Sequence, residues 1–210
     1  GFLWRMQANA EGIGRAKRKG LSKAWTVEGR MTFWLAREWQ DVTAREICSA
    51  LDLVNDELLP RKLTCGQWTP FVMRALVPVA QRRCALGAGT PVCGHKHRQE
   101  RDQCRIEWLY DFSCWLEGST PEESFLGLPI AVECEWLNWS EVCDDFDKLV
   151  QSRAGLRVMI FQRESGDRTT ENWRDLLFAR ARRFKPSLDD DAWLLACWEA
   201  GSFQYRSNLF

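Results

Sequence analysis

The sequence predicts a mixed α/β domain in which a β-sheet is flanked by helices, with a helical N-terminal part and a C-terminal β-hairpin. Three observations predict this class. Apolar residues recur at helical spacing through residues 31–86. Two segments of alternating polarity follow, and then a helix, a continuous apolar strand, a second helix and two short strands. With 210 residues, the chain is long enough to bury the core of one domain.

The composition is that of a globular protein without a strong overall charge. Hydrophobic residues make up 45% and charged residues 28% of the chain, which is ordinary for a soluble domain. The formal net charge is +0, so a nucleic-acid partner would have to be met by a local basic patch. The 12 tryptophans indicate a large core or exposed stacking surfaces.

Three features predict a cytoplasmic location with no membrane partner. No run approaches the roughly 18 apolar residues of a membrane span, and the opening residues lack a signal-peptide pattern. The nine cysteines are scattered, and several lie in apolar segments, which is typical of reduced, buried thiols.

The first 30 residues form a basic arm, and residues 31–210 are predicted to form a single domain. The arm carries seven basic residues against two acidic ones. A solvated arm and a contact with nucleic-acid phosphates both explain this charge.

Two helices are expected to open the domain. The first covers 31–59 and ends at Pro60, and the second covers 67–86, with Pro70 near its start and Pro78 as a kink. Residues 87–103, rich in glycine and charge, are expected to form a polar loop.

Two strands are expected next, each with acidic side chains on one face. Residues 104–116 alternate strictly, with Asp111 and Glu107 on the polar face. Residues 128–136 form the second strand, with Glu133 and Glu135 on the face opposite its apolar side chains.

The remaining elements alternate between helix and strand. A helix over 140–155 is predicted with Ser140 as N-cap and Gly155 as C-cap, and a buried strand follows at 156–162. The unit from 129 to 162 is therefore expected to be a parallel, right-handed strand–helix–strand unit. A helix over 171–184 and two strands around Gly201 complete the chain.

The acids on the two strands suggest a metal site if the strands are neighbours. Asp111, Glu133 and Glu135 would then converge, and their mutual repulsion would raise their pKa values. A Mg²⁺ ion removes that conflict and supports phosphoryl chemistry. The structural alternative is that these acids face solvent and pair with Arg105 across strands.

The pattern resembles the PD-(D/E)XK, or restriction-endonuclease-like, nuclease superfamily. The resemblance covers residues 100–162: Asp111, about twenty residues, Glu133-Cys134-Glu135 on an apolar strand, a helix, and then the strand "RVMIF". It implies a restriction-endonuclease-like sheet and a nuclease acting on nucleic acid, with DNA as the expected partner. It also implies that Asp111 and Glu133 hold Mg²⁺ or Mn²⁺, and that the catalytic residues are Asp111, Glu133 and Glu135.

The chain departs from this family pattern at Glu135, where the family usually has the lysine that serves the attacking water. Some members supply that lysine from the following helix, and Lys148 is the candidate. Helical spacing places Val142, Phe146 and Leu149 against the sheet and predicts that Lys148 points away.

Three other interpretations remain open. The same fold could bind nucleic acid or a protein without catalysis. A second group of residues could hold zinc, or it could be a basic surface loop with incidental cysteines: Cys84, Cys93, His95, His97 and Cys104. The bases that end the helix over 171–184 could complement its dipole or contact phosphates: Arg180, Arg182, Arg183 and Lys185.

Overall fold

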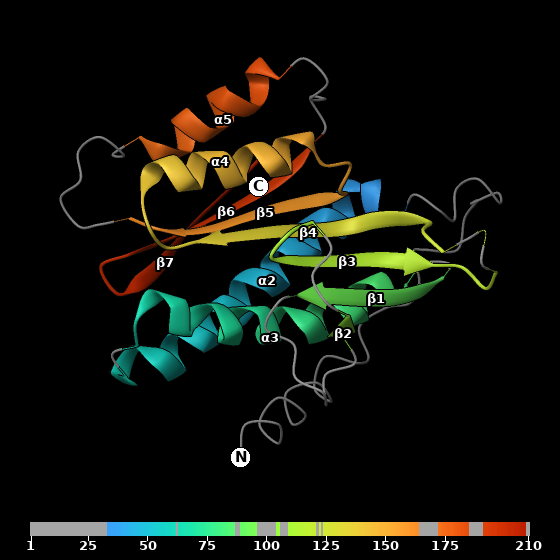
Figure 1. The fold of residues 1–210 in the computed structure, drawn as a ribbon, viewed down its shortest axis with the longest axis horizontal. Helices are drawn as coiled ribbons and strands as arrows, with labels where there is room; N and C mark the ends of the chain where they lie inside the picture. The colour runs from blue at the N-terminus through green and yellow to red at the C-terminus, as the bar shows by residue number, and fades with distance from the viewer. Residues whose placement is uncertain are drawn as a thin grey trace.

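The computed structural model of the protein describes residues 33–61, 63–86, 89–95, 104–105, 109–120, 122, 124–163, 172–184 and 191–208. These residues build one seven-stranded mixed sheet between two helical layers (Figure 1). The mixed α/β class, the flanking helices and the C-terminal hairpin are therefore confirmed. The basic arm, residues 1–30, lies outside the described residues.

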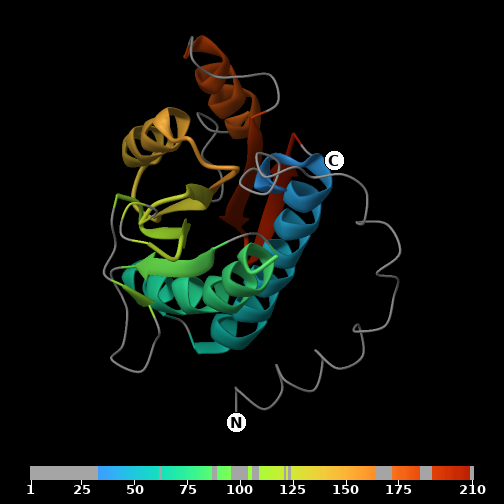
Figure 2. The ribbon, with the colours of Figure 1, turned by 90° about the vertical axis from the view of Figure 1, so that its right-hand side faces the viewer.

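Helices cover both faces of the sheet (Figures 1 and 2). On one side lie α2 (Arg37–Leu58), the short 3₁₀ helix η2 (Leu59–Arg61) and α3 (Cys65–Cys84). On the other side lie α4 (Trp139–Gln151) and α5 (Trp173–Arg183). These are the four expected helices, and α3 continues through both of its prolines.

The strands follow almost the order of the chain. They are β1 (Thr90–His95), β2 (Cys104–Arg105), β3 (Phe112–Glu117), β4 (Gly127–Glu135), β5 (Leu156–Gln162), β6 (Ala192–Glu199) and β7 (Ser202–Ser207). The order across the sheet is β2-β1-β3-β4-β5-β6-β7. Strand β4 is antiparallel to β3 and parallel to β5, and the parallel pairing is the one that the sequence predicts.

Two predictions for residues 87–116 are wrong. The expected polar loop contains β1, which is held by pairing with β2 and β3 on its two sides. The single strand expected over 104–116 is split, because β2 pairs with β1 and β3 begins only at Phe112. Tertiary pairing outweighs the local pattern here, as is common for strands.

The predicted caps of the 140–155 helix are also wrong. Asn138 is the N-cap of α4, because its side-chain oxygen accepts hydrogen bonds from the backbone N–H groups of Ser140 and Glu141. The helix ends at Gln151, so Gly155 lies beyond it, in the connection to β5.

A central proline in β4 coincides with an irregularity in the sheet. The register between β3 and β4 shifts between Cys114 and Leu116, whose partners Ile130 and Gly127 flank Pro129. Parallel pairing with β5 begins only at Ile130. The missing N–H of Pro129 is therefore tolerated inside a central strand, where proline is otherwise rare.

Trp34, which lies just before α2, packs against two glycines. A Cβ atom at Gly127 would lie 2.4 Å from Trp34 Cζ2, and one at Gly155 would lie 2.4 Å from Trp34 Cδ1. Gln40 on α2 reinforces this contact, because its Nε2 donates a hydrogen bond of 2.9 Å to the carbonyl oxygen of Gly155. The indole thus occupies space that only glycine leaves open.

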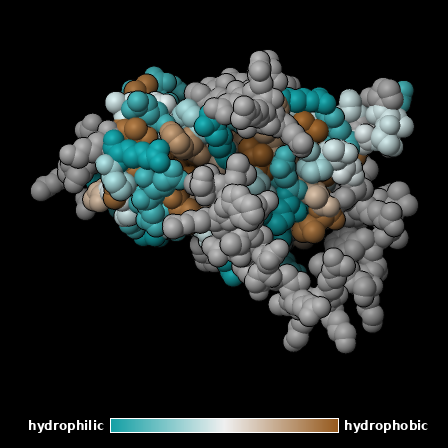
Figure 3. Space-filling model, turned by 90° about the horizontal axis from the view of Figure 1, so that it is seen from below, coloured by the Kyte–Doolittle hydropathy of each residue, from teal (hydrophilic) through white to brown (hydrophobic). Residues whose placement is uncertain are grey.

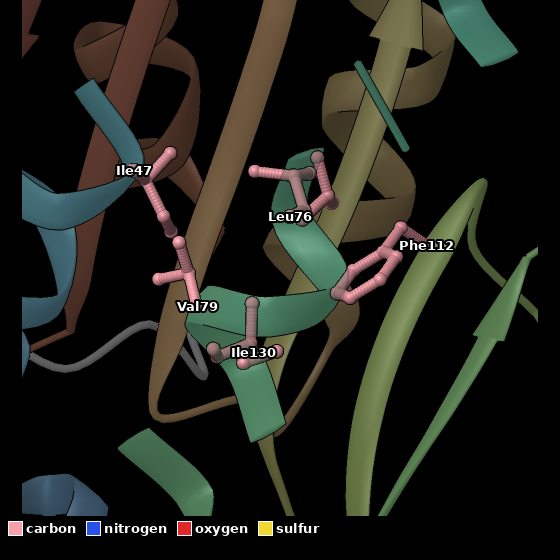
Figure 4. A pocket seen from close by; sticks show the side chains of 7 residues that line it. Ile47, Leu76, Val79, Phe112 and Ile130 are labelled. Atoms are coloured by element: carbon pink, nitrogen blue, oxygen red, sulfur yellow. The ribbon is translucent and has the colours of Figure 1, made fainter. Parts of the chain in front are cut away.

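The core on this side is apolar and closely packed. Ile47, Leu76, Val79, Phe112 and Ile130 line an interior gap between α2, α3 and the sheet that has no room for a water molecule (Figure 4). Seen from below, the coloured part of the outer surface is largely hydrophilic, with hydrophobic residues in small separate groups (Figure 3). No described helix is long and apolar enough to cross a membrane.

Polar contacts join α2 to the C-terminal hairpin. The Tyr205 hydroxyl donates to Asp52 over 2.7 Å, and the indole N–H of Trp198 donates to the Asn55 side chain over 2.9 Å. Asn55 also donates to the carbonyl oxygen of Gly201. Helix α2 and the last two strands therefore stabilise each other's position.

The turn between β6 and β7 leads to a stability prediction. Ala200 has φ 50° and Gly201 has φ 89°, as in the two-residue turns that favour Asn-Gly. Replacing Ala200 by Asn should raise the free energy of unfolding by about 0.5–1 kcal/mol, because alanine is disfavoured in this conformation. Urea unfolding would measure the gain. Ala200→Val, which is β-branched, should instead lower stability, and the reverse order would contradict this explanation.

Candidate active site

Asp111, immediately before β3, and Glu133 of β4 lie side by side. Phe112 pairs with Val132, so the next position places Asp111 opposite Glu133. The Asp111 backbone N–H donates to Glu133 Oε2 over 3.3 Å, and the Cys134 backbone N–H donates to Asp111 Oδ2 over 3.0 Å. The two strands therefore hold the two carboxyl groups together through each other's main chain.

Both carboxyl groups belong to the sheet face that α4 covers. On β4, Val132 and Cys134 pack in the core beneath α2 and α3, whereas Ala131 packs with Phe146 of α4. Glu133 shares the side of Ala131 because side chains alternate along a strand. The residue is 2% exposed, so the carboxyl group lies beneath α4 in a nearly dry environment.

This environment changes the protonation of Glu133. Burial raises the pKa of Glu133 to about 8, with further increases from Asp111 and Asp145, while Lys148 acts in the opposite direction. Oε1 of Glu133 is buried and has no hydrogen-bond partner among the described residues. Glu133 is therefore largely protonated at neutral pH, although a lysine lies nearby.

That lysine is Lys148, which corrects one prediction. Its Nζ lies 3.8 Å from Glu133 Oε1 and also pairs with Asp145, one helical turn earlier. The expected buried face of α4, with Phe146 at its centre, is confirmed. The prediction that Lys148 is a solvated partner of acids on its own helix is confirmed, because its side chain is 54% exposed and pairs with Asp145. The prediction that it points away from the site is wrong, because its long stem brings the ammonium to 3.8 Å from Glu133.

The charge of Lys148 is well supported by its surroundings. Its hydrogen bond to Asp145, followed by the charges of Glu133 and Asp111, raises the pKa of the Lys148 ammonium. The Lys148 ammonium therefore stays protonated and lies near three acidic side chains, those of Asp111, Glu133 and Asp145.

Glu135 takes a different position from the other two predicted catalytic residues. Its carboxylate is half-buried and accepts a hydrogen bond from the backbone N–H of Leu137, in the turn before α4. In the described part of the chain it makes no hydrogen bond or ion pair with Asp111, Glu133 or Lys148. The catalytic role of Glu135 stays a prediction, and the expected convergence of three carboxylates is reduced to two.

Two carboxyl groups fit the needs of a Mg²⁺ or Mn²⁺ ion. Mg²⁺ usually takes one or two carboxylates and completes its shell with waters and substrate phosphates. Asp111 and Glu133 could supply oxygen ligands, and Oε1 of Glu133 accepts no hydrogen bond from the described residues, with the Lys148 ammonium 3.8 Å away. Across the described ranges, no three side chains of His, Cys, Asp or Glu form a group suited to a metal.

Asp145 is a neighbour that helical spacing predicts for Lys148, but it was not among the predicted site residues. It lies three residues before Lys148, so both project from the same side of α4. That spacing, next to the apolar face of a helix following the acidic strand, was the available signal. The acids do not pair with Arg105 as the structural alternative required, because Arg105 pairs with Glu117 at 2.8 Å. Glu107 lies outside the described residues.

The second predicted constellation is buried inside the sheet. Cys93 on β1 lies opposite Cys104 on β2 and opposite Cys114 on β3, and Cys84 at the end of α3 belongs to the same core. The interpretation of this segment as a basic surface loop is wrong for the described positions, because Cys93, His95 and Cys104 are buried in strands and Cys84 is buried at the end of α3. His97 lies outside the described residues, and zinc binding stays a prediction.

The basic end of α5 lies away from the two carboxyl groups. Arg180 pairs with Asp147 of α4, while Arg182 and Arg183 are exposed. The helix ends near the start of β6, at the opposite edge of the sheet from the end of β4 (Figure 1). Complementing the helix dipole is therefore the simpler account of these bases, and Lys185 lies outside the described residues.

Comparison with protein-family models, with curated proteins and with solved structures finds no match to this chain.

Proposed function

We propose that the protein is a metal-dependent nuclease that hydrolyses phosphodiester bonds of nucleic acid, with DNA as the substrate and the cytoplasm as its setting. The observation that supports this most is the arrangement of Asp111, Glu133 and Lys148. Two carboxyl groups lie together on adjacent strands, and a lysine ammonium from the next helix lies 3.8 Å from one of them. This is the order of elements on which the resemblance to the PD-(D/E)XK superfamily rests.

Each residue has a distinct role in the proposal. Asp111 and Glu133 would hold Mg²⁺ or Mn²⁺, which when bound would activate water and offset the charge of the phosphoryl group. Lys148 takes the role of the lysine that Glu135 replaces in the strand motif. Its ammonium orients the attacking water and stabilises negative charge on the phosphate oxygens. Asp145 holds that ammonium in place.

A non-catalytic nucleic-acid or protein binding module on the same fold is the second candidate. Two observations favour it. Glu135 stands where the family usually has lysine, and Glu133 keeps its proton to about pH 8, which weakens cation binding at neutral pH. Cleavage assays separate the two candidates.

The test is cleavage of labelled single-stranded and duplex DNA with Mg²⁺ or Mn²⁺. The wild type should cleave, and its rate should rise as pH approaches 8, because Glu133 must lose its proton to bind the cation. Asp111→Asn, Glu133→Gln and Lys148→Met should each lower the rate by at least about 100-fold.

Glu141→Gln is the matched control, because this exposed acid lies in the first turn of α4. It should cleave like the wild type. If Lys148→Met cleaves normally while Glu135→Gln is inactive, the strand residue performs the role assigned here to the helix. A wild type that binds DNA but cleaves it with neither metal at pH 8.5 supports the binding module instead.

A further inference from the structure

A polar pocket lies at the edge of the sheet where β5 and β6 end and β7 begins. Its volume is about 320 Å³, within the range of small-molecule sites. The lining residues are Arg163, Trp173, Glu199, Ala200, Ser202, Gln204 and Arg206. They come from the ends of β5 and β6, from β7 and from the first turn of α5.

The pocket shares a sheet face with the candidate active site. On β7, Phe203 packs in the core beneath α2 and α3, so the alternating residues Ser202, Gln204 and Arg206 face the side of α4 and α5. Trp173, which contacts Phe161 with ring centroids 5.3 Å apart, closes the pocket on that side.

The register of the sheet also connects the two places. Glu133 pairs with Met159, Met159 with Leu195, and Leu195 with Arg206, so one row of residues crosses four adjacent strands. The next row on this face joins Glu135 to Gln204 through Phe161 and Cys197. At about 4.8 Å per strand, the backbone of Arg206 lies roughly 14 Å from that of Glu133, a span of a few nucleotides.

The charge of the pocket favours an anion. Arg163 pairs with Glu199 at 2.9 Å, which balances one cation. The Arg206 guanidinium donates to the neighbouring carbonyl oxygen of Tyr205 and, among the described residues, has no carboxylate partner. A guanidinium with donors to spare binds phosphate oxygens well. Ser202 and Gln204 add neutral donors and acceptors beside it.

We propose that this pocket binds one nucleotide of a single-stranded segment of the substrate, with Arg206 on a phosphate and Gln204 on the base or sugar. The inference rests on the proposed nuclease function, because this pocket would define the path of the nucleic-acid strand that the nuclease cuts. A concave site of this volume can hold one unpaired nucleotide, whereas a duplex is too wide for its paired nucleotides to enter. The nucleic-acid strand runs along the edge of the sheet, because α4 and α5 cover the rows of residues between the candidate active site and the pocket.

Binding can be measured without turnover by fluorescence anisotropy, with a labelled single-stranded oligonucleotide and its duplex in Ca²⁺ or EDTA. The wild type should bind the single strand more tightly. Arg206→Gln should weaken that binding about tenfold and make the slope of log affinity against log salt shallower by about 0.7. Arg45→Gln makes the same charge change on α2, at the other face of the sheet, and should leave the affinity unchanged.

Gln204→Glu provides a second variant, because it places a negative charge in the pocket while keeping the side chain's size. It should also weaken binding of the single strand. Normal binding in both pocket variants, or a preference of the wild type for duplex, overturns the pocket assignment. If the wild type still cleaves DNA in that case, the nuclease proposal survives. Binding that depends on Arg206 without any cleavage would overturn the nuclease and keep the pocket.

Discussion

Replacing Glu133 by Gln should stabilise the metal-free protein at pH 9 and leave its stability at pH 5 almost unchanged. Burial raises the pKa of Glu133 from 4.5 to about 8, with Asp111 and Asp145 adding to the shift. Between these values the folded protein keeps a proton that the unfolded chain has released. The free energy of unfolding of the wild type therefore falls as pH rises through this window.

The loss of stability with rising pH is set by the difference between the pKa of Glu133 in the unfolded and in the folded chain. A shift of this extent corresponds to a loss on the order of 3–5 kcal/mol by pH 9. A glutamine keeps the shape of the side chain and cannot ionise, so the variant should not show this loss. At pH 9 its melting temperature should exceed that of the wild type by about 10 °C.

Thermal unfolding in EDTA from pH 5 to pH 9 measures this difference. Glu141→Gln, which removes an exposed acid of α4, should follow the wild-type profile within a few tenths of a kcal/mol. Asp111→Asn removes one of the charges that raise the pKa of Glu133, so its decline should be smaller and should end at lower pH. Parallel profiles for Glu133→Gln and the wild type would show that Glu133 is not a buried acid.

Trp34→Ala should destabilise the protein by about 3–5 kcal/mol, because it empties the slot between β4 and β5 that the indole fills. Gly127→Ala should cost about 2–3 kcal/mol for the opposite reason, since the new methyl group would overlap the ring. All three atoms closest to that methyl group belong to the Trp34 side chain.

The double variant is the decisive measurement. In the Trp34→Ala background, Gly127→Ala should cost little, and the coupling free energy should be about 2 kcal/mol. Gly66→Ala is the matched control, because a Cβ there meets no atom within 4 Å and the residue lies in the first turn of α3. It should be neutral or stabilising. Additive effects of Trp34→Ala and Gly127→Ala would mean that the indole does not lie over Gly127.

The sequence allowed most of the regular elements to be predicted, for identifiable reasons. The helix over 31–59 and the strand over 156–162 have strong periodicity or continuous apolar character, and each is buried as that pattern requires. Strands β1 and β2 could not be predicted in the same way. Their six and two residues owe their structure to partners on neighbouring strands rather than to local preference.

The candidate site was predictable at the level of the backbone but not of the side-chain tips. The alternation of side chains along the two segments correctly predicted that Asp111 lies beside Glu133. The position of Lys148 Nζ depends on a long side chain, and the direction of Glu135 depends on a local hydrogen bond to Leu137. Neither is determined by the direction in which a Cβ atom points.

The contacts between α2 and the C-terminal hairpin set a requirement on the order of folding. Tyr205 bonds to the carbonyl oxygen of Cys48, 157 residues earlier in the chain, and Trp198 bonds to Asn55 across 143 residues. Strands β4 to β7 can join the sheet one after another as the ribosome releases them, because each of them pairs with its predecessor. The apolar side of α2 stays partly uncovered until β6 and β7 arrive. Chaperone binding should therefore be strongest on nascent chains that contain α2 but lack this hairpin.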